Sequence, residues 1–193
     1  MNYEKGQKLA HIELGRFLAT FEHTTHYFKD CIQFILEDNG LKNSDYAEIL
    51  LNRLTAEPVK SILQGMIAYR FSDNNQSILN KVITQYSYLI EIRNVVIHSY
   101  WAIGVGIEED KSVSLIGIKT RNSKKGITHF NLDLELEDFH EINEMNENFC
   151  MLICDLKNTI VDEEDKIKTL CENGLQEIDF KILIQRFKET NSK

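Results

Sequence analysis

A single proline, Pro58, occurs in this chain of 193 residues, and the shortage of helix breakers constrains the fold more than any other feature. Proline removes a backbone donor and breaks helices, so loop-rich all-β proteins usually contain several. Hydrophobic residues make up 42% of the chain, which is enough for a substantial core. The sequence therefore predicts a mainly helical protein formed by one domain, residues 1–193.

Apolar residues recur every three or four positions over several segments, as they do along the buried face of a helix. Pro58 predicts the first turn of a short helix, and Ser44 is the predicted N-cap of the helix before it. The other helices are predicted over residues 8–36, 46–54, 76–99, 137–160, 164–171 and 178–188. Inward positions include Leu9, Ile12, Phe17, Phe21, Phe28, Ile32, Ile35 and Leu36 in the first helix and Ile49, Leu50 and Leu54 in the second.

Residues 101–136 depart from the helical pattern and hold four of the nine glycines. Within this segment, residues 112–118 and 127–136 alternate polar with apolar side chains, and a polar, basic turn lies between them. The alternation predicts a β-hairpin inserted after the long helix over 76–99. A third short strand is expected over residues 103–107.

Basic residues gather in one segment of an otherwise acidic chain. The formal net charge is −8, which argues against nucleic-acid binding over the whole surface. The acidic excess lies mainly in residues 135–147 and 162–165, so it is compatible with a local basic site for RNA. The turn of the predicted hairpin either contacts an RNA backbone or serves only solubility. The basic residues are Lys111, Lys119, Arg121, Lys124 and Lys125.

Several other classes of protein are not indicated. No apolar run is long enough to span a bilayer, and the N-terminus lacks the apolar core of a signal peptide, so we expect a cytoplasmic protein. Phosphate-binding loops, dinucleotide-binding glycine patterns, zinc-protease motifs and nucleophile elbows do not occur. The four cysteines are expected to be reduced thiols, and His23 and His26 to lie on a solvated helix face. We therefore predict neither a metal site nor a cofactor.

The segment Arg93–Tyr100 ends a long predicted helix and carries the most reactive side chains. Asn94 and His98 lie one turn apart on a polar stripe, whereas Arg93 falls in register with the apolar stripe. A buried arginine without a partner is costly, so Arg93 must find a carboxylate, a cavity or an interface. Glu22 on the first helix is one candidate partner.

The spacing of Arg93 and His98 raises a geometric problem, because five residues separate side chains by about 140° around an ideal helix. Three arrangements bring both groups to one atom. The helix ends or bends between them, the length of arginine compensates, or two copies meet across a two-fold axis. Structural roles are also consistent with the pattern: a histidine at a helix C-terminus, and an arginine in an ion pair.

The stretch Arg93-Asn94-x-x-x-His98 resembles the R-x(4–6)-H signature of HEPN domains, in which the residue after the arginine is commonly polar. The resemblance covers the segment Arg93–Tyr100 and the helical layout, but not the hairpin. It implies a helical bundle that dimerises with its motifs facing each other and, in many members, metal-independent ribonuclease activity. Such a protein would be a toxin or a phage-defence effector.

The resemblance also implies roles for individual residues. His98 is the expected general acid or base, Arg93 binds the phosphate, and Asn94 orients His98 or holds the phosphate. The 2′-hydroxyl of RNA would attack the adjacent phosphate and leave a 2′,3′-cyclic phosphate. Tyr100 and Trp101 could stack on unpaired bases, although packing at the base of the hairpin is the favoured role of Trp101.

Two alternatives to a free-standing nuclease stay open. Tyr100 extends the pattern to R-x(4)-H-x-Y, which resembles HEPN toxins paired with a nucleotidyltransferase antitoxin that attaches AMP to the tyrosine. The resemblance then implies control through Tyr100. The other alternative is a catalytically silent HEPN module that binds nucleotide or a protein partner.

Overall fold

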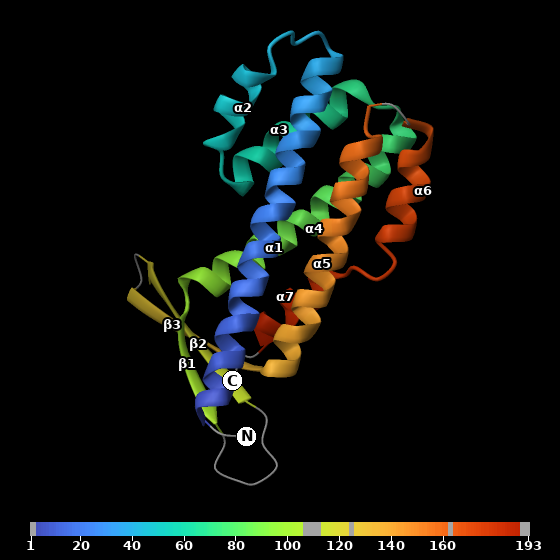
Figure 1. The fold of residues 1–193 in the computed structure, drawn as a ribbon. Coiled ribbons are helices and arrows are strands. Elements are labelled where there is room, and N and C mark those ends of the chain that lie inside the picture. The colour runs from blue at the N-terminus through green and yellow to red at the C-terminus, as the bar shows by residue number, and fades with distance from the viewer. Residues whose placement is uncertain (1–2, 106–112, 124–125, 162–163, 190–193) are drawn as a thin grey trace.

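The structure is a computed structural model that describes residues 3–105, 113–123, 126–161 and 164–189. Helices dominate the described part of the chain, as the sequence predicts (Figure 1). The helices are α1 (Tyr3–Asp38), α2 (Ser44–Asn52), α3 (Ala56–Arg70), α4 (Asp73–His98), α5 (Leu136–Thr159), α6 (Glu164–Gly174) and α7 (Phe180–Glu189). The strands are β1 (Tyr100–Val105), β2 (Val113–Ser123) and β3 (Gly126–Glu135).

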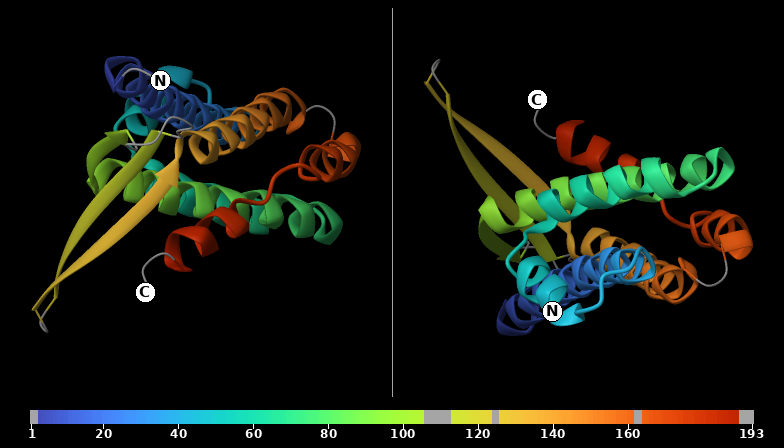
Figure 2. Two further views of the ribbon diagram at one scale, coloured as in Figure 1. Left: turned by 90° about the horizontal axis from the view of Figure 1, so that it is seen from below. Right: turned by 90° about the horizontal axis from the view of Figure 1, so that it is seen from above.

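The long helices α1, α4 and α5 form the body of the protein in two layers. Helices α1 and α5 run side by side, and α4 crosses them in the second layer together with α7 (Figures 1 and 2). Helices α2 and α3 pack against α1, and α6 packs against α4 and α5. None of the described helices combines the length and the apolar character that a bilayer crossing requires.

An aromatic cluster joins the two layers at the centre of the core. The ring of Phe28 in α1 lies 4.3 Å from that of Tyr86 in α4 and 6.2 Å from that of Phe149 in α5. Phe180 at the start of α7 packs edge-on against Phe149. The Tyr86 hydroxyl donates a 2.9 Å hydrogen bond to Thr25, and burial raises the pKa of this phenol. Offset and edge-on ring pairs of this kind add to the free energy gained by burial alone.

The three strands form one antiparallel sheet in the order β1-β2-β3, in the segment where the sequence predicts a hairpin. Strand β1 pairs with residues 113–118 of β2 only. Strands β2 and β3 continue past this point, and their far ends project from the helical body as a two-stranded arm (Figure 2). The sheet therefore leaves the bundle directly after α4 and returns directly into α5.

Three of the inward positions predicted for the first two helices are wrong. Ile12, Ile49 and Leu50 are all at least half exposed. Helix α2 packs on α1 with Ala47 and Leu51 as its buried residues instead. Leu54 lies outside α2 and is half-buried.

The predicted cap of α2 is also shifted by one residue. The N-cap is Asn43 rather than Ser44, and its side chain accepts a 3.0 Å hydrogen bond from the backbone N–H of Asp45. Asparagine and serine are about equally good N-caps, so their relative order in the sequence could not decide between them.

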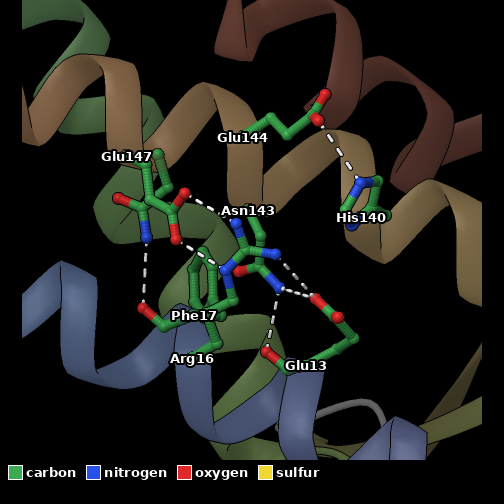
Figure 3. Close-up of polar contacts among 8 residues, drawn as sticks. Glu13, Arg16, Phe17, His140, Asn143, Glu144 and Glu147 are labelled. Carbon is green, nitrogen blue, oxygen red and sulfur yellow. Dashed lines mark hydrogen bonds and ion pairs between the residues drawn. The ribbon is translucent and has the colours of Figure 1, made fainter.

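A bidentate ion pair fastens α1 to α5. The Nε and terminal nitrogen of Arg16 lie 2.5 and 2.6 Å from the two carboxylate oxygens of Glu147, and Glu13 lies 3.5 Å from the same guanidinium (Figure 3). The hydrogen bond from Arg16 lowers the pKa of Glu147, and the same bond raises the pKa of Arg16. The planar fork of arginine fits a carboxylate in this geometry, which fixes the lengthwise register of the two helices.

Two buried asparagines reinforce that register. The amide of Asn143 donates to the backbone carbonyl and the carboxylate of Glu13, and the amide of Asn146 donates to the carbonyl of Phe17 (Figure 3). The side-chain oxygens of both asparagines are buried without a partner among the described residues. Sliding α5 along α1 would also leave both amide nitrogens unpaired, and a buried unpaired donor costs about 1–3 kcal/mol.

Replacing Glu147 with glutamine is expected to lower the free energy of unfolding by less than about 1 kcal/mol at pH 7, because the side chains of Arg16 and Glu147 are 32% and 41% exposed. The folded-state pKa of Glu147 is depressed, so this stabilisation is present above about pH 4.3, the unfolded value, and disappears as the pH falls through the folded value. Urea unfolding at pH 7 and pH 3 measures the difference between wild type and Glu147→Gln. An equal difference at both values would contradict the assignment.

Candidate functional site

Helix α4 continues without a break through Arg93 and His98 and ends because Ser99 adopts an extended backbone. The Ser99 hydroxyl donates to the carbonyl of Val95 at 2.7 Å, and the Trp101 indole donates to the carbonyl of Val96 at 2.8 Å. The carbonyls in the last turn of a helix lack intrahelical donors, and these two bonds supply donors to two of them. The end of α4 is therefore firmly defined, and His98 is its last residue.

Trp101 fixes the first strand to the bundle as well. Its ring packs edge-on against Phe139 in the first turn of α5, with 5.5 Å between centroids. This contact places the Trp101 ring against the start of α5. The contact positions the backbone of β1 relative to the ends of α4 and α5.

Arg93 is held between α1 and α4 by three kinds of contact. One terminal nitrogen lies 3.7 Å from a carboxylate oxygen of Glu22, and the other donates a 3.3 Å hydrogen bond to Asn94. The guanidinium carbon lies 5.6 Å from the centre of the Phe21 ring, within the range of a cation–π contact. The predicted pairing of Arg93 with Glu22 is thus confirmed, and it explains how an arginine occupies the apolar side of α4.

The pairing leaves part of the Arg93 side chain accessible to solvent. The Arg93 side chain is 29% exposed, and the Glu22 side chain is 62% exposed, so the contact lies at the protein surface. A separation of 3.7 Å is longer than a charge-assisted hydrogen bond. The Nε of Arg93 is buried and has no hydrogen-bond partner among the described residues. Arginine carries five N–H donors, so a phosphate can bind here by displacing the carboxylate of Glu22.

His98 is exposed at the C-terminal end of α4, where its imidazole is accessible to solvent. Because α4 remains helical to this residue, His98 lies about 7.5 Å further along the axis than Arg93 and about 140° around it. The arrangement in which the helix ends between them is wrong. The length of arginine or a second copy of the chain must then bring the two groups to one substrate. Asn94 lies one turn before His98 and is half-buried.

The remaining candidates lie along the sheet. Tyr100 of β1 pairs with Ile118 of β2, and Lys119 is the residue after Ile118. Arg121 is three residues beyond Ile118, which is about 10 Å along the strand. Both basic positions belong to β2 where it extends past β1. Lys124 and Lys125 lie outside the described residues. Along the sheet, the backbone of Tyr100 is therefore near that of Lys119 and further from that of Arg121.

The two histidines singled out in α1 lie on the same helix as Glu22, the partner of Arg93. His23 and His26 are exposed, and His26 lies 3.7 Å from Asp30. Over the described ranges, no group of three or more histidine, cysteine or acidic side chains could hold a metal ion. Cys31 and Cys171 are buried free thiols, and burial raises the pKa of Cys171 to about 12.

Sequence reasoning missed two features near α1. Phe21 was assigned only to the core, yet its ring also lies beneath the guanidinium of Arg93. The asparagine contacts of α5 were not foreseen, although Asn143 and Asn146 stand within the apolar stripe of that helix, which is itself a signal. Both features depend on how α1 packs against its neighbours.

Comparison of the chain with protein-family models, with curated proteins and with solved structures gives no match. The geometry and chemistry around Arg93 and His98 are therefore the basis for a functional proposal.

Proposed function

We propose that this protein is a metal-independent RNA endonuclease of HEPN type, acting as a toxin or a phage-defence effector. His98 acts as a general acid or base, because histidine is the side chain most commonly used for proton transfer in catalysis. Arg93 binds the scissile phosphate and stabilises the charge that develops on its oxygens. The RNA 2′-hydroxyl attacks the adjacent phosphorus, the bond to the 5′-oxygen breaks, and a 2′,3′-cyclic phosphate and a 5′-hydroxyl end result.

The observation that carries the proposal is the loose pairing of Arg93. Arg16, which joins α1 to α5, makes two short hydrogen bonds to Glu147, at 2.5 and 2.6 Å. Arg93 has a carboxylate no nearer than 3.7 Å among the ion pairs of the described residues, and it lies near the same end of α4 as exposed His98. A phosphate dianion or diester satisfies such a guanidinium better than Glu22 does.

A second copy of the chain would bring its His98 to the phosphate that Arg93 of the first copy binds. The angular separation of Arg93 and His98 on α4 points them to different sides of the helix. Ile97 beside His98 is 40% exposed, and an apolar side chain there favours contact with a partner. In a homodimer paired through the ends of the two α4 helices, the histidine of each copy can reach the phosphate held by the other. Two histidines would then serve the two proton transfers.

The arm formed by β2 and β3 offers a path for the RNA backbone. Lys119 and Arg121 occupy alternate positions of β2, next to the end of β1 that begins with Tyr100. Basic side chains along such a path attract phosphates, and their contribution falls as salt concentration rises. The acidic net charge of the chain, −8, argues against RNA binding over the whole surface and is compatible with a local basic site of this kind.

One observation favours the catalytically silent alternative. Glu22, Asn94 and Phe21 together provide Arg93 with an ion pair, a hydrogen bond and a ring contact, which are contacts typical of an arginine with a structural role. In that case Arg93 would fasten α4 to α1, and the module would bind a nucleotide or a protein partner without cleaving RNA.

Incubation of the purified chain with RNA in the presence of EDTA distinguishes these functions. The nuclease is expected to cleave without added metal and to yield 2′,3′-cyclic phosphate ends, which mass spectrometry of the fragments identifies. Arg93→Ala should lower the rate about 100-fold or more, since a charge-stabilising donor is worth that much. Arg70→Ala is a matched control, because Arg70 also pairs with a carboxylate of α1, that of Asp38. Absence of cleavage by the wild type would favour the silent module, whereas full activity of Arg93→Ala would remove Arg93 from the mechanism.

A further inference from the structure

Helix α2 has an apolar stripe on the side turned away from the bundle. Tyr46, Ile49 and Leu50 are 65%, 58% and 69% exposed, whereas the inner positions Ala47 and Leu51 are buried. Residues advance by about 100° each along a helix, so positions 46, 49, 50 and 53 share one side. A short surface helix normally presents polar residues there. The outer side of α2 therefore has the composition of a contact surface.

The stripe is completed by a charged residue at its end. Arg53 is the C-cap of α2 and keeps helical backbone angles, so it continues the spacing that Tyr46, Ile49 and Leu50 begin. It is exposed, and no ion pair joins it to another of the residues that the structure describes. Asp45, also exposed, borders the stripe at the opposite end of the helix. The surface thus carries opposite charges at its two ends.

We propose that two copies of this chain pair through α2, antiparallel across a two-fold axis. In this arrangement Ile49 of each copy lies opposite Leu50 of the other, and Tyr46 lies opposite Arg53. The guanidinium of each copy then covers the phenol ring of the other and reaches the adjacent Asp45. Cation–π and ion-pair contacts of this kind are made twice, as two-fold symmetry requires.

Charge complementarity favours a second copy over an unrelated partner. Antiparallel pairing is the orientation that sets Arg53 against Asp45, whereas parallel pairing sets like charges together. Arg53 also approaches the positive end of the facing helix, and Asp45 in the first turn offsets this repulsion. A self-complementary stripe needs no other molecule to satisfy it.

This surface is separate from the end of α4. Helix α2 lies beside the C-terminal half of α1, whereas α4 ends beside β1 (Figure 1). The inference therefore goes beyond the proposed nuclease and does not depend on it. Nine helical residues span only about 13 Å, so the contact is smaller than the roughly 800 Å² per partner of a standard interface. We expect reversible association in the micromolar to millimolar range.

Sedimentation velocity of the full chain over a range of concentrations tests the pairing. Ile49→Glu combined with Leu50→Glu is expected to weaken self-association at least about tenfold, because both changes put charge at the centre of the contact. Ile182→Glu is the matched control, since Ile182 is a similarly exposed isoleucine on α7. Thermal unfolding of each variant shows that the fold is retained. An unchanged sedimentation profile for the double variant, or an equal effect of Ile182→Glu, overturns the proposal.

A charge exchange tests the orientation. Arg53→Asp alone should weaken association, and Arg53→Asp together with Asp45→Arg should restore it, which a general loss of solubility or folding cannot do. Failure of the exchange to restore association overturns the antiparallel arrangement. RNA cleavage by these variants is expected to equal that of the wild type, so loss of pairing and loss of the proposed nuclease are measured separately.

Discussion

Replacement of His98 by alanine is expected to abolish RNA cleavage and to leave the fold intact. General acid–base catalysis by one side chain contributes roughly 100- to 10,000-fold, and in the proposed homodimer the substitution removes both catalytic imidazoles. His98 is exposed at the end of α4, where Ser99 and Trp101 cap the helix through other carbonyls. The change in the free energy of unfolding should therefore stay within about 0.5 kcal/mol.

Initial cleavage rates in EDTA measure the loss of activity. Circular dichroism and thermal unfolding measure whether the fold is intact. His140→Ala is the control, because His140, like His98, is an exposed histidine on a helix. His140 lies 3.3 Å from Glu144. Undiminished cleavage by His98→Ala would remove His98 from the mechanism. Equal loss in His140→Ala would point instead to an indirect effect on the bundle.

Replacement of Phe28 by alanine is expected to cost about 3–5 kcal/mol of folding free energy, the usual range for a fully buried phenylalanine. Phe28 has no exposed surface, and its ring contacts Tyr86 and Phe149 from the neighbouring helices α4 and α5. Its loss leaves a cavity at the junction of both layers, where three long helices limit how far the structure can collapse. A loss of this size is a large part of the stability of a typical domain.

Denaturant unfolding of Phe28→Ala against Phe34→Ala checks this result. Phe34 lies on the same helix and is 36% exposed, so its substitution should cost clearly less. Similar midpoints for the two variants would show that the packing at Phe28 is not as tight as the ring distances indicate.

Much of the helical layout was predictable because, in the long helices, the side that carries the apolar residues is also the side that is buried. The predicted segments over 8–36, 76–99 and 137–160 correspond to α1, α4 and α5, whose bounds differ from them by a few residues. Each of these helices is covered by others along most of its length, so its apolar stripe is also its buried stripe. The prediction was wrong in α2, where one side of a nine-residue helix packs on α1 and the opposite side remains exposed.

The candidate site was predictable in its residues and only partly in its geometry. The register of Arg93 with an apolar stripe required a partner, and Glu22 is that partner. The distance of 3.7 Å and the exposure of both groups depend on how α1 and α4 cross, which no local pattern encodes. The same holds for Phe21, whose ring reaches Arg93 from the neighbouring helix.

The sequence by itself determined that the chain is mainly helical and which side of each long helix carries apolar residues, because spacing along a helix is a local property of the backbone. It also determined that Arg93, Asn94 and His98 lie within two turns at the end of one helix. Only the tertiary structure decided that α4 remains helical to His98, that Arg93 is paired loosely at the surface, and that the outer stripe of α2 is left uncovered. These features follow from the positions of neighbouring elements, which depend on contacts between residues far apart in the chain.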